Sequence, residues 1–189
     1  AILALLPTYL DNPQASLVYM VEALIHKSPY PHSGFFLDEY EKLRANLKAL
    51  QEKNIPTLLF GVSYALLTLA EQHPMDLSGV TIMETGGMKG QRKEMVRAEL
   101  HEILKARLNQ KTIHSEYGMT ELLSQAYSKG DGIFRTPPWM KVLIRDPYDP
   151  FTITETGKGA LNIVDLANVH SCAFIATQDL GERFEDGSF

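Results

Sequence analysis

Short apolar runs alternate with helical patterns over the first two thirds of the chain. The runs are bounded by polar or glycine-containing segments, which is typical of buried strands, and they cover residues 3–6, 56–62, 80–84 and 112–114. Apolar residues at helical spacing predict amphipathic helices over residues 12–26, 38–53, 64–72 and 91–108. Repeated strand–helix units of this length predict an α/β fold, with a parallel sheet flanked by helices.

Local signals refine two of these elements and predict one more. Asp38 and Glu41 are spaced as a capping box at the start of one helix. Ser63 stands at a strand-to-helix junction, where a hydroxyl caps a helix well. A further helix is expected to begin near Thr120.

The pattern changes near Pro137. From there the apolar runs are short and joined by turn-forming residues, which predicts strands over residues 141–145, 151–154, 160–165 and 173–177. We therefore expect two subdomains. Residues 1–136 would form the α/β subdomain, and residues 137–189 a small, mostly antiparallel β-subdomain.

Composition narrows the class of protein. Of 189 residues, 44% are hydrophobic, which is enough for a full core and too many for a disordered chain. The net charge of −5 disfavours a general nucleic-acid binder, and no apolar run approaches the roughly 18 residues of a membrane-spanning helix. One cysteine, Cys172, cannot form an internal disulfide, and its apolar surroundings favour burial in the core over the alternative role of an acyl-accepting thiol. We expect a cytoplasmic protein with no nucleic-acid partner and no membrane span.

Three loops lie where parallel sheets place ligands, at residues 84–87, 115–121 and 177–181. In the middle loop, the Tyr117 ring can stack on a planar base, and Gly118 allows close approach of the backbone. Thr120 offers a hydroxyl to a phosphate oxygen, and Glu121 is the type of ligand that Mg²⁺ takes beside phosphates. From residue types alone, a plain loop with its tyrosine in the core remains the alternative.

The order of these residues adds a resemblance. Tyr-Gly-Met-Thr-Glu at residues 117–121 resembles the Tyr-Gly-x-Thr-Glu motif of the adenylate-forming enzymes, which include acyl-CoA synthetases and luciferases. Residues 83–87 look like that family's small-residue loop, residues 155–161 like its Gly-Glu-x-Gly-Glu-Leu turn, and residues 179–181 like its Thr-Gly-Asp-Leu segment. Within that family, the residues of these segments are most similar to those of the acyl-protein synthetase branch, the luciferin-component ligases that supply fatty-acid reductase.

The resemblance implies ATP-dependent activation of a fatty or aryl carboxylic acid to an acyl-adenylate. The acyl group would then pass to a thiol, either coenzyme A or a protein cysteine, with a reductase or carrier as a further partner. ATP and Mg²⁺ would be required. The residues implied are Thr120 and Glu121 for catalysis, Glu121 for the metal, and for the nucleotide Gly86, Gly87, Tyr117, Gly118 and Asp179.

The chain also departs from the family. Gln178 replaces the glycine that usually precedes the ribose-binding aspartate. The phosphate loop and the catalytic lysine of the mobile C-terminal domain are not found. Together with the strand-like start and the Asp-Gly turn near the end, these gaps predict that the chain is part of a larger enzyme and incomplete for catalysis.

Two other functions stay open. Ser63, Asp165 and His170 follow the chain order of a serine hydrolase, although Ala65 replaces the last glycine of the nucleophile elbow. A non-catalytic nucleotide-binding module would keep the base and ribose contacts alone. The basic segment at residues 89–107 is either a solvated helix face or a docking surface for the carrier or reductase.

Overall fold

The computed structural model describes residues 1–7, 15–88, 90–93 and 95–189. The chain forms two compact units, Ala1–Ser115 and Glu116–Phe189, and each is described by itself. The proline-rich junction near Pro137 lies inside the second unit, and the subdomain boundary expected there stays a prediction.

Parallel strands and their connecting helices build the first unit. The strands are β1 (Ile2–Leu5), β2 (Gly34–Phe36), β3 (Thr57–Val62), β4 (Val80–Thr85) and β5 (His114–Tyr117), whose last two residues belong to the second unit. The helices are α1 (Ser16–Lys27), α2 (Tyr40–Glu52), α3 (Ser63–Gln72) and α4 (Arg97–Leu108). Hydrogen-bonded neighbours follow the order β2-β1-β3-β4-β5, and each pair is parallel.

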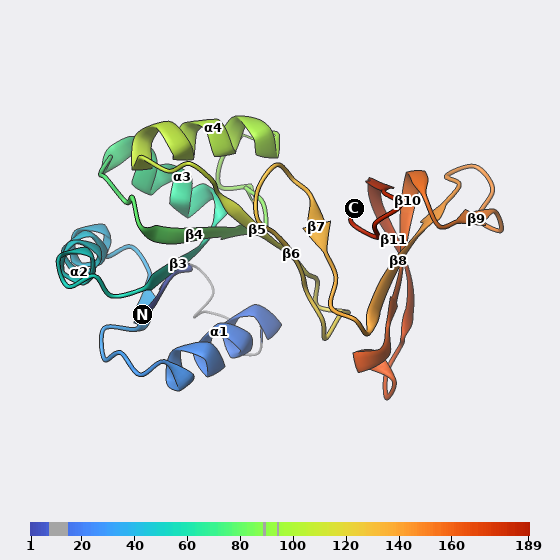
Figure 1. Cartoon of the computed structure of the whole chain (residues 1–189), viewed down its shortest axis with the longest axis horizontal. Coiled ribbons are helices and arrows are strands. Elements are labelled where there is room, and N and C mark those ends of the chain that lie inside the picture. The colour runs from blue at the N-terminus through green and yellow to red at the C-terminus, as the bar shows by residue number, and fades with distance from the viewer. Residues whose placement is uncertain (8–14, 89, 94) are drawn as a thin grey trace. The chain divides into compact units, whose positions relative to one another are not determined.

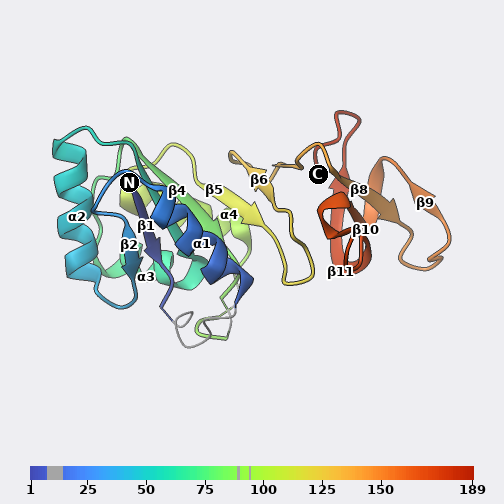
Figure 2. The ribbon, with the colours of Figure 1, turned by 90° about the horizontal axis from the view of Figure 1, so that it is seen from below.

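Helices cover both faces of this sheet. In Figure 1, α3 and α4 lie side by side above the strands and α1 lies below them, and Figure 2 shows α1 from that lower side. Strand β3 is buried along almost its whole length, as expected for a parallel strand covered on both faces. The helices contribute fully buried leucines to this core, including Leu43, Leu47, Leu66, Leu69 and Leu104.

The second unit is built from antiparallel strands. Strands β6 (Ala126–Ser128) and β7 (Phe134–Arg135) pair with each other and complete the strand order of the mostly parallel sheet, β2-β1-β3-β4-β5-β6-β7. A separate sheet has the order β11-β10-β8-β9, made of β8 (Met140–Arg145), β9 (Ile153–Thr154), β10 (Gly157–Asp165) and β11 (Phe174–Arg183). Its core side chains include Val142, Ile144, Leu161 and Ile163, with Phe134 and Phe189 beside them. These two sheets confirm the predicted fold class.

Several local predictions are wrong. Helix α4 begins at Arg97 rather than at residue 91, because the described residues between Gly90 and Arg97 form a turn, bends and irregular backbone instead of a helix. Strand β5 starts at His114, two residues later than expected. No helix begins near Thr120, since residues 120 and 121 form a turn that leads into β6.

Both predicted helix caps are also wrong. Helix α2 begins at Tyr40 with Glu39 at the capping position, and no side chain caps it. Glu41 instead pairs with Arg44 at 3.1 Å. Ser63 is the first residue of α3, and its hydroxyl bonds outside that helix.

Cys172 is exposed, not buried as the sequence suggested. It precedes β11 rather than lying within it, and its Sγ is 3.2 Å from the carbonyl oxygen of Phe174. In the described parts of the chain, no helix is long and apolar enough to cross a membrane.

Candidate functional site

A buried carboxylate occupies the carboxyl end of the first unit's sheet. Glu84, near the end of β4, is only 2% exposed. Ser63 follows β3 next to it, and Ser115 lies on β5 on its other side. Glu84 and Ser115 meet because the parallel pairing of β4 and β5 places them in register, and Ser63 follows directly after the end of β3.

Four side chains surround the Glu84 carboxylate. Ser63 donates its hydroxyl to Oε2 at 2.9 Å, and Arg97 donates from Nε to Oε1 at 3.0 Å. His101 Nε2 lies 3.5 Å from the same Oε1 and 3.4 Å from the hydroxyl oxygen of Ser115. Burial alone would raise the pKa of Glu84, but the His101 contact, the Arg97 charge and the two hydroxyls hold that pKa below its usual value.

This cluster holds the loop that carries Gly86 and Gly87. The Ser63 hydroxyl lies 3.0 Å from the carbonyl oxygen of Gly86, and both glycines are exposed. Gly86 has φ of +68°, a backbone conformation that favours glycine. The two predicted glycines therefore form an exposed turn above a buried ionic cluster in the first unit.

The sequence alone did not identify Glu84, Arg97 and His101 as candidate functional residues. One signal was available, namely an acidic residue inside an otherwise apolar strand pattern. A second was the spacing of four between Arg97 and His101, which places both on one face of a helix.

In the second unit, Tyr117 lies among aromatic rings at the end of β5. Its ring meets Phe134 edge-on at 6.0 Å between centroids and Phe189 at 5.5 Å. Its hydroxyl donates to Oδ2 of Asp179 at 2.6 Å. Burial and the Asp179 carboxylate raise the pKa of Tyr117 well above its usual value, so the hydroxyl remains a donor at neutral pH.

A local irregularity in β11 positions Asp179. The pairing of β10 with β11 shifts between Ala160 and Asn162, which leaves residues 177–179 opposite the single residue Leu161. The Thr177 hydroxyl donates to the carbonyl oxygen of Leu161 and accepts from the amide of Asp179 at 3.2 Å. The Asp179 side chain is exposed, with Oδ2 engaged by Tyr117.

The predicted motif continues from Tyr117 into a close approach at Gly118. A Cβ atom at Gly118 would lie 2.2 Å from Oε1 of Glu116, whose side chain is buried. A larger residue there would have to displace the Glu116 carboxylate. Gly118 therefore allows the Glu116 carboxylate to lie close to the backbone of this segment.

Thr120 and Glu121 are exposed in the following turn. Asn168 holds this turn through the carbonyl oxygen of Glu121 at 2.6 Å and the amide of Leu123 at 2.8 Å. The turn leaves the Glu121 carboxyl exposed to solvent, where it can bind a cation that enters together with a ligand.

The buried carboxylate of Asp165 fixes the nearby residue Ser124. It accepts from the Ser124 amide at 2.9 Å and from the Ser124 hydroxyl at 2.8 Å, and from the amide of Ala167 at 3.0 Å. Sequence reasoning missed Asn168 altogether and assigned Asp165 to another site.

The structure therefore brings Tyr117 and Asp179 together, although they lie 62 positions apart in the sequence. A half-buried ring beside an exposed carboxylate suits an aromatic base and the hydroxyls of an attached sugar. Among the described residues, no three His, Cys, Asp or Glu side chains form a metal-binding group. A single exposed carboxylate such as Glu121 fits Mg²⁺ that arrives with phosphates, because Mg²⁺ commonly binds through one or two carboxylates plus phosphate oxygens.

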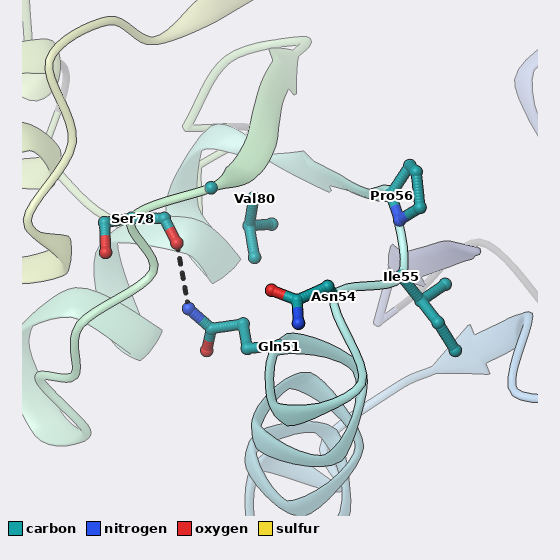
Figure 3. Close-up of a pocket in the computed structure, with 7 residues that line it drawn as sticks. Gln51, Asn54, Ile55, Pro56, Ser78 and Val80 are labelled. Atoms are coloured by element: carbon teal, nitrogen blue, oxygen red, sulfur yellow. Dashed lines mark hydrogen bonds between the residues drawn. The ribbon is translucent and has the colours of Figure 1, made fainter.

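A separate cavity lies at the opposite, amino ends of β3 and β4. It has a volume of about 310 Å³. Its lining comes from the segment between α2 and β3 and from the turn before β4, and includes Asn54, Pro56 and Val80. Figure 3 shows Gln51 at its wall, donating to the carbonyl oxygen of Ser78 at 3.0 Å. The described residues that line it are all uncharged. Ligands of α/β sheets bind at the carboxyl ends of the strands, and this cavity lies at the opposite end.

The residues of the alternative hydrolase site have other partners. Ser63 bonds to Glu84 and Gly86, while Asp165 bonds to Ser124 and Ala167. His170 is exposed after the 3₁₀ helix Leu166–Asn168. These hydrogen bonds give the Ser63, Asp165 and His170 arrangement no support.

No protein-family model matches the chain, and no curated protein matches it.

Proposed function

We propose that the chain binds ATP in an enzyme that activates a carboxylic acid. In the reaction, a carboxylate oxygen of the acid attacks the α-phosphorus of ATP, and the bond to the β-phosphate bridging oxygen breaks. Pyrophosphate leaves, and the acyl-adenylate then reacts with a thiol, releasing AMP. The thiol is coenzyme A or a protein cysteine, and a reductase or carrier would receive the acyl group.

The hydrogen bond between Tyr117 and Asp179 carries this proposal. It joins two segments that the resemblance to adenylate-forming enzymes independently assigns to the base and the ribose. A carboxylate has about four acceptor positions, so Asp179 can keep the Tyr117 hydroxyl on Oδ2 and still accept ribose hydroxyls. Tyr117 thereby holds the carboxylate in place while its ring offers a face to the adenine.

The exposed turn at Thr120 and Glu121 supplies the remaining groups. The Thr120 hydroxyl would donate to a phosphate oxygen, and Glu121 would hold Mg²⁺ beside it. The metal would offset negative charge on the phosphates. Positioning and charge neutralisation account for most of the catalysis expected of a protein in phosphorus chemistry of this kind.

Binding of MgATP to Asp179→Asn tests the nucleotide site. Hydrogen bonds to a charged group contribute about 1.5–3 kcal/mol, so calorimetry should show affinity falling by about tenfold or more. Glu182→Gln is the matched control, because it removes a negative charge from the same strand at a side chain that pairs with Lys158. It should leave the affinity nearly unchanged.

A nucleotide without ribose hydroxyls makes the test specific. The unmodified chain should bind 2′,3′-dideoxy-ATP more weakly than ATP, and Asp179→Asn should lose this preference. Equal binding of both nucleotides by the unmodified chain would rule out Asp179 as the ribose ligand. Acid-dependent exchange of pyrophosphate into ATP then separates the enzyme from a non-catalytic module, which would bind ATP without exchange.

A further inference from the structure

A second cavity lies in the second unit, between β7, β8 and the turn after β11. Its volume is about 210 Å³. Three cationic side chains line it, Arg135 from β7, Lys141 from β8 and Arg183 from the end of β11. Among the described lining residues, Asp186 is the one carboxylate, so positive charge exceeds negative there.

The three cations are not equally neutralised. Arg135 pairs with Asp186 at 2.8 Å, and Lys141 pairs with Glu155 at 2.5 Å. Arg183 donates from Nη1 to the backbone carbonyl of Glu155, which is an uncharged acceptor. Lys141 and, more weakly, the Arg183 charge lower the pKa of Glu155, but within the described residues no carboxylate oxygen lies at ion-pair distance from Arg183.

The Arg183 guanidinium is also incompletely hydrogen-bonded. Its Nε is buried and has no acceptor in the parts of the chain that the structure describes. Buried donors are rarely left in this state, and each case needs an explanation. The guanidinium lies beside the turn, where its Nη2 would be 3.6 Å from a Cβ atom at Gly187.

The two existing ion pairs can exchange partners at little cost. The side chains of Arg135 and Asp186 are 66% and 53% exposed, and those of Lys141 and Glu155 are 48% and 68% exposed. Exposed pairs of this kind contribute little to stability. Arg135 and Lys141 can therefore turn toward an incoming anion while Asp186 and Glu155 remain in water.

This cavity is separate from the Tyr117 ring cluster. Phe134 and Phe189 exchange two backbone hydrogen bonds, and both rings lie against Tyr117. Successive side chains of a strand point to opposite faces, so Arg135 faces away from Phe134. None of the three rings lines the cavity, although Met140 and Val142, which pack in the same apolar cluster as Phe134 and Phe189, do.

We propose that this cavity binds a phosphate dianion, either free or as the phosphomonoester of a small molecule. Arginine forms paired hydrogen bonds with phosphate oxygens. Among the three described cations of the lining, Arg183 is the one without an ion pair to a carboxylate. Arg135 and Lys141 close around the anion, and their acid partners are released to solvent. The proposal does not depend on ATP binding at Tyr117 and Asp179, because neither residue lines the cavity.

Titration calorimetry at constant ionic strength tests the cavity with inorganic phosphate, glycerol 3-phosphate and chloride. Phosphate should bind and chloride should not. Arg183→Gln should weaken phosphate binding by about tenfold or more, since it removes charged hydrogen bonds. Lys158→Gln, which removes a positive charge from the neighbouring strand outside the cavity, should change binding by less than about twofold.

Arg135→Gln guards against misfolding of the first variant, because the Arg135 side chain is largely exposed. It should unfold at the same urea concentration as the unmodified chain and still bind phosphate more weakly. Tighter binding of glycerol 3-phosphate than of phosphate would identify a phosphomonoester, and the reverse would identify free phosphate. Phosphate binding no stronger than chloride binding, or equal losses in Arg183→Gln and Lys158→Gln, would overturn the proposal.

Discussion

Replacing Glu84 by glutamine removes the charge at the centre of the buried cluster and keeps the side chain's size. The introduced amide can still direct its oxygen to Arg97 and its nitrogen to Ser63, whose hydroxyl can then donate to Gly86 instead. What is lost is the charge on hydrogen bonds from Arg97 and His101. The variant therefore isolates the electrostatic part of the cluster.

The expected loss in unfolding free energy is about 2 kcal/mol. Hydrogen bonds to charged groups contribute about 1.5–3 kcal/mol, and breaking a fully buried ion pair costs about 3–5 kcal/mol. The higher range does not apply, because the Arg97 side chain is 43% exposed and can be solvated when its partner is neutral.

The chain allows each unit to be followed by its own signal. All four α-helices of the described chain lie in the first unit, so far-ultraviolet circular dichroism reports mainly on that unit. The single tryptophan, Trp139, lies in the second unit and reports there by fluorescence. With a urea dependence of about 1–3 kcal/mol per molar, Glu84→Gln should lower the dichroism midpoint by about 1 M. The fluorescence midpoint should move much less.

Acid should abolish this difference. The pKa of Glu84 is lower in the folded chain than in the unfolded chain. Its contribution is therefore fully present above the unfolded pKa, about 4.3, and is lost as pH falls through the lower folded pKa. The gap between Glu84→Gln and the unmodified chain should be constant from neutral pH to about pH 5 and should shrink below about pH 4.

Glu71→Gln is the control for loss of a surface charge. Glu71 lies in α3 of the same unit and pairs with Arg92 at 2.5 Å, but its side chain is 44% exposed. Exposed pairs contribute about 0–1 kcal/mol, so this variant should unfold near the midpoint of the unmodified chain. Equal shifts for Glu71→Gln and Glu84→Gln, or a gap that widens in acid, would refute the assigned role of the buried cluster.

Two further variants test the second unit by Trp139 fluorescence in urea. Gly159→Ala should destabilise it by about 1–3 kcal/mol, because the new Cβ would lie 2.5 Å from the backbone carbonyl oxygen of Arg145. Gly34→Ala, where a Cβ meets nothing within 4 Å, should leave the dichroism midpoint of the first unit nearly unchanged, and equal destabilisation by the two alanines would contradict the steric argument. Asn168→Ala should also cost about 1–3 kcal/mol, since it removes both side-chain hydrogen bonds to the turn at residues 121–123. An unchanged midpoint would show that this turn is stable without the two Asn168 hydrogen bonds.

The sheet could be predicted from sequence because its strands are continuous apolar runs. Strand β3 was expected over residues 56–62 and covers Thr57–Val62, and β4 exceeds its expected range by one residue. Such strands are buried on both faces, so their apolar character persists without interruption. Helix starts depend on single turns and caps, and there the prediction failed at both α2 and α4.

The missing helix near Thr120 shows why local signals fail. The residues favour a helix start, but side chains more than 40 positions away take the backbone groups of this segment. Asn168 binds the amide of Leu123, and Asp165 binds the amide of Ser124. These partners are fixed by the fold of the second unit. A local pattern contains no information about them.

The Glu84 cluster could not be predicted from the sequence for the same reason, because its members are distant in the chain. Its members are the first residue of α3, one residue each of β4 and β5, and two residues on one face of α4. Only the parallel order of these strands brings them to one point. The order of strands was not predicted, so the cluster could not be.

The substitution at Gln178 is compatible with the proposed role of Asp179. The resemblance places a glycine at this position, which would matter if the backbone there were left-handed. In this chain the φ angle of Gln178 lies outside that region. The bulge in β11 and the Thr177 hydroxyl direct the chain instead, and the Gln178 side chain is exposed. Asp179 therefore reaches Tyr117 with ordinary backbone geometry, and glycine is not needed to place the carboxylate.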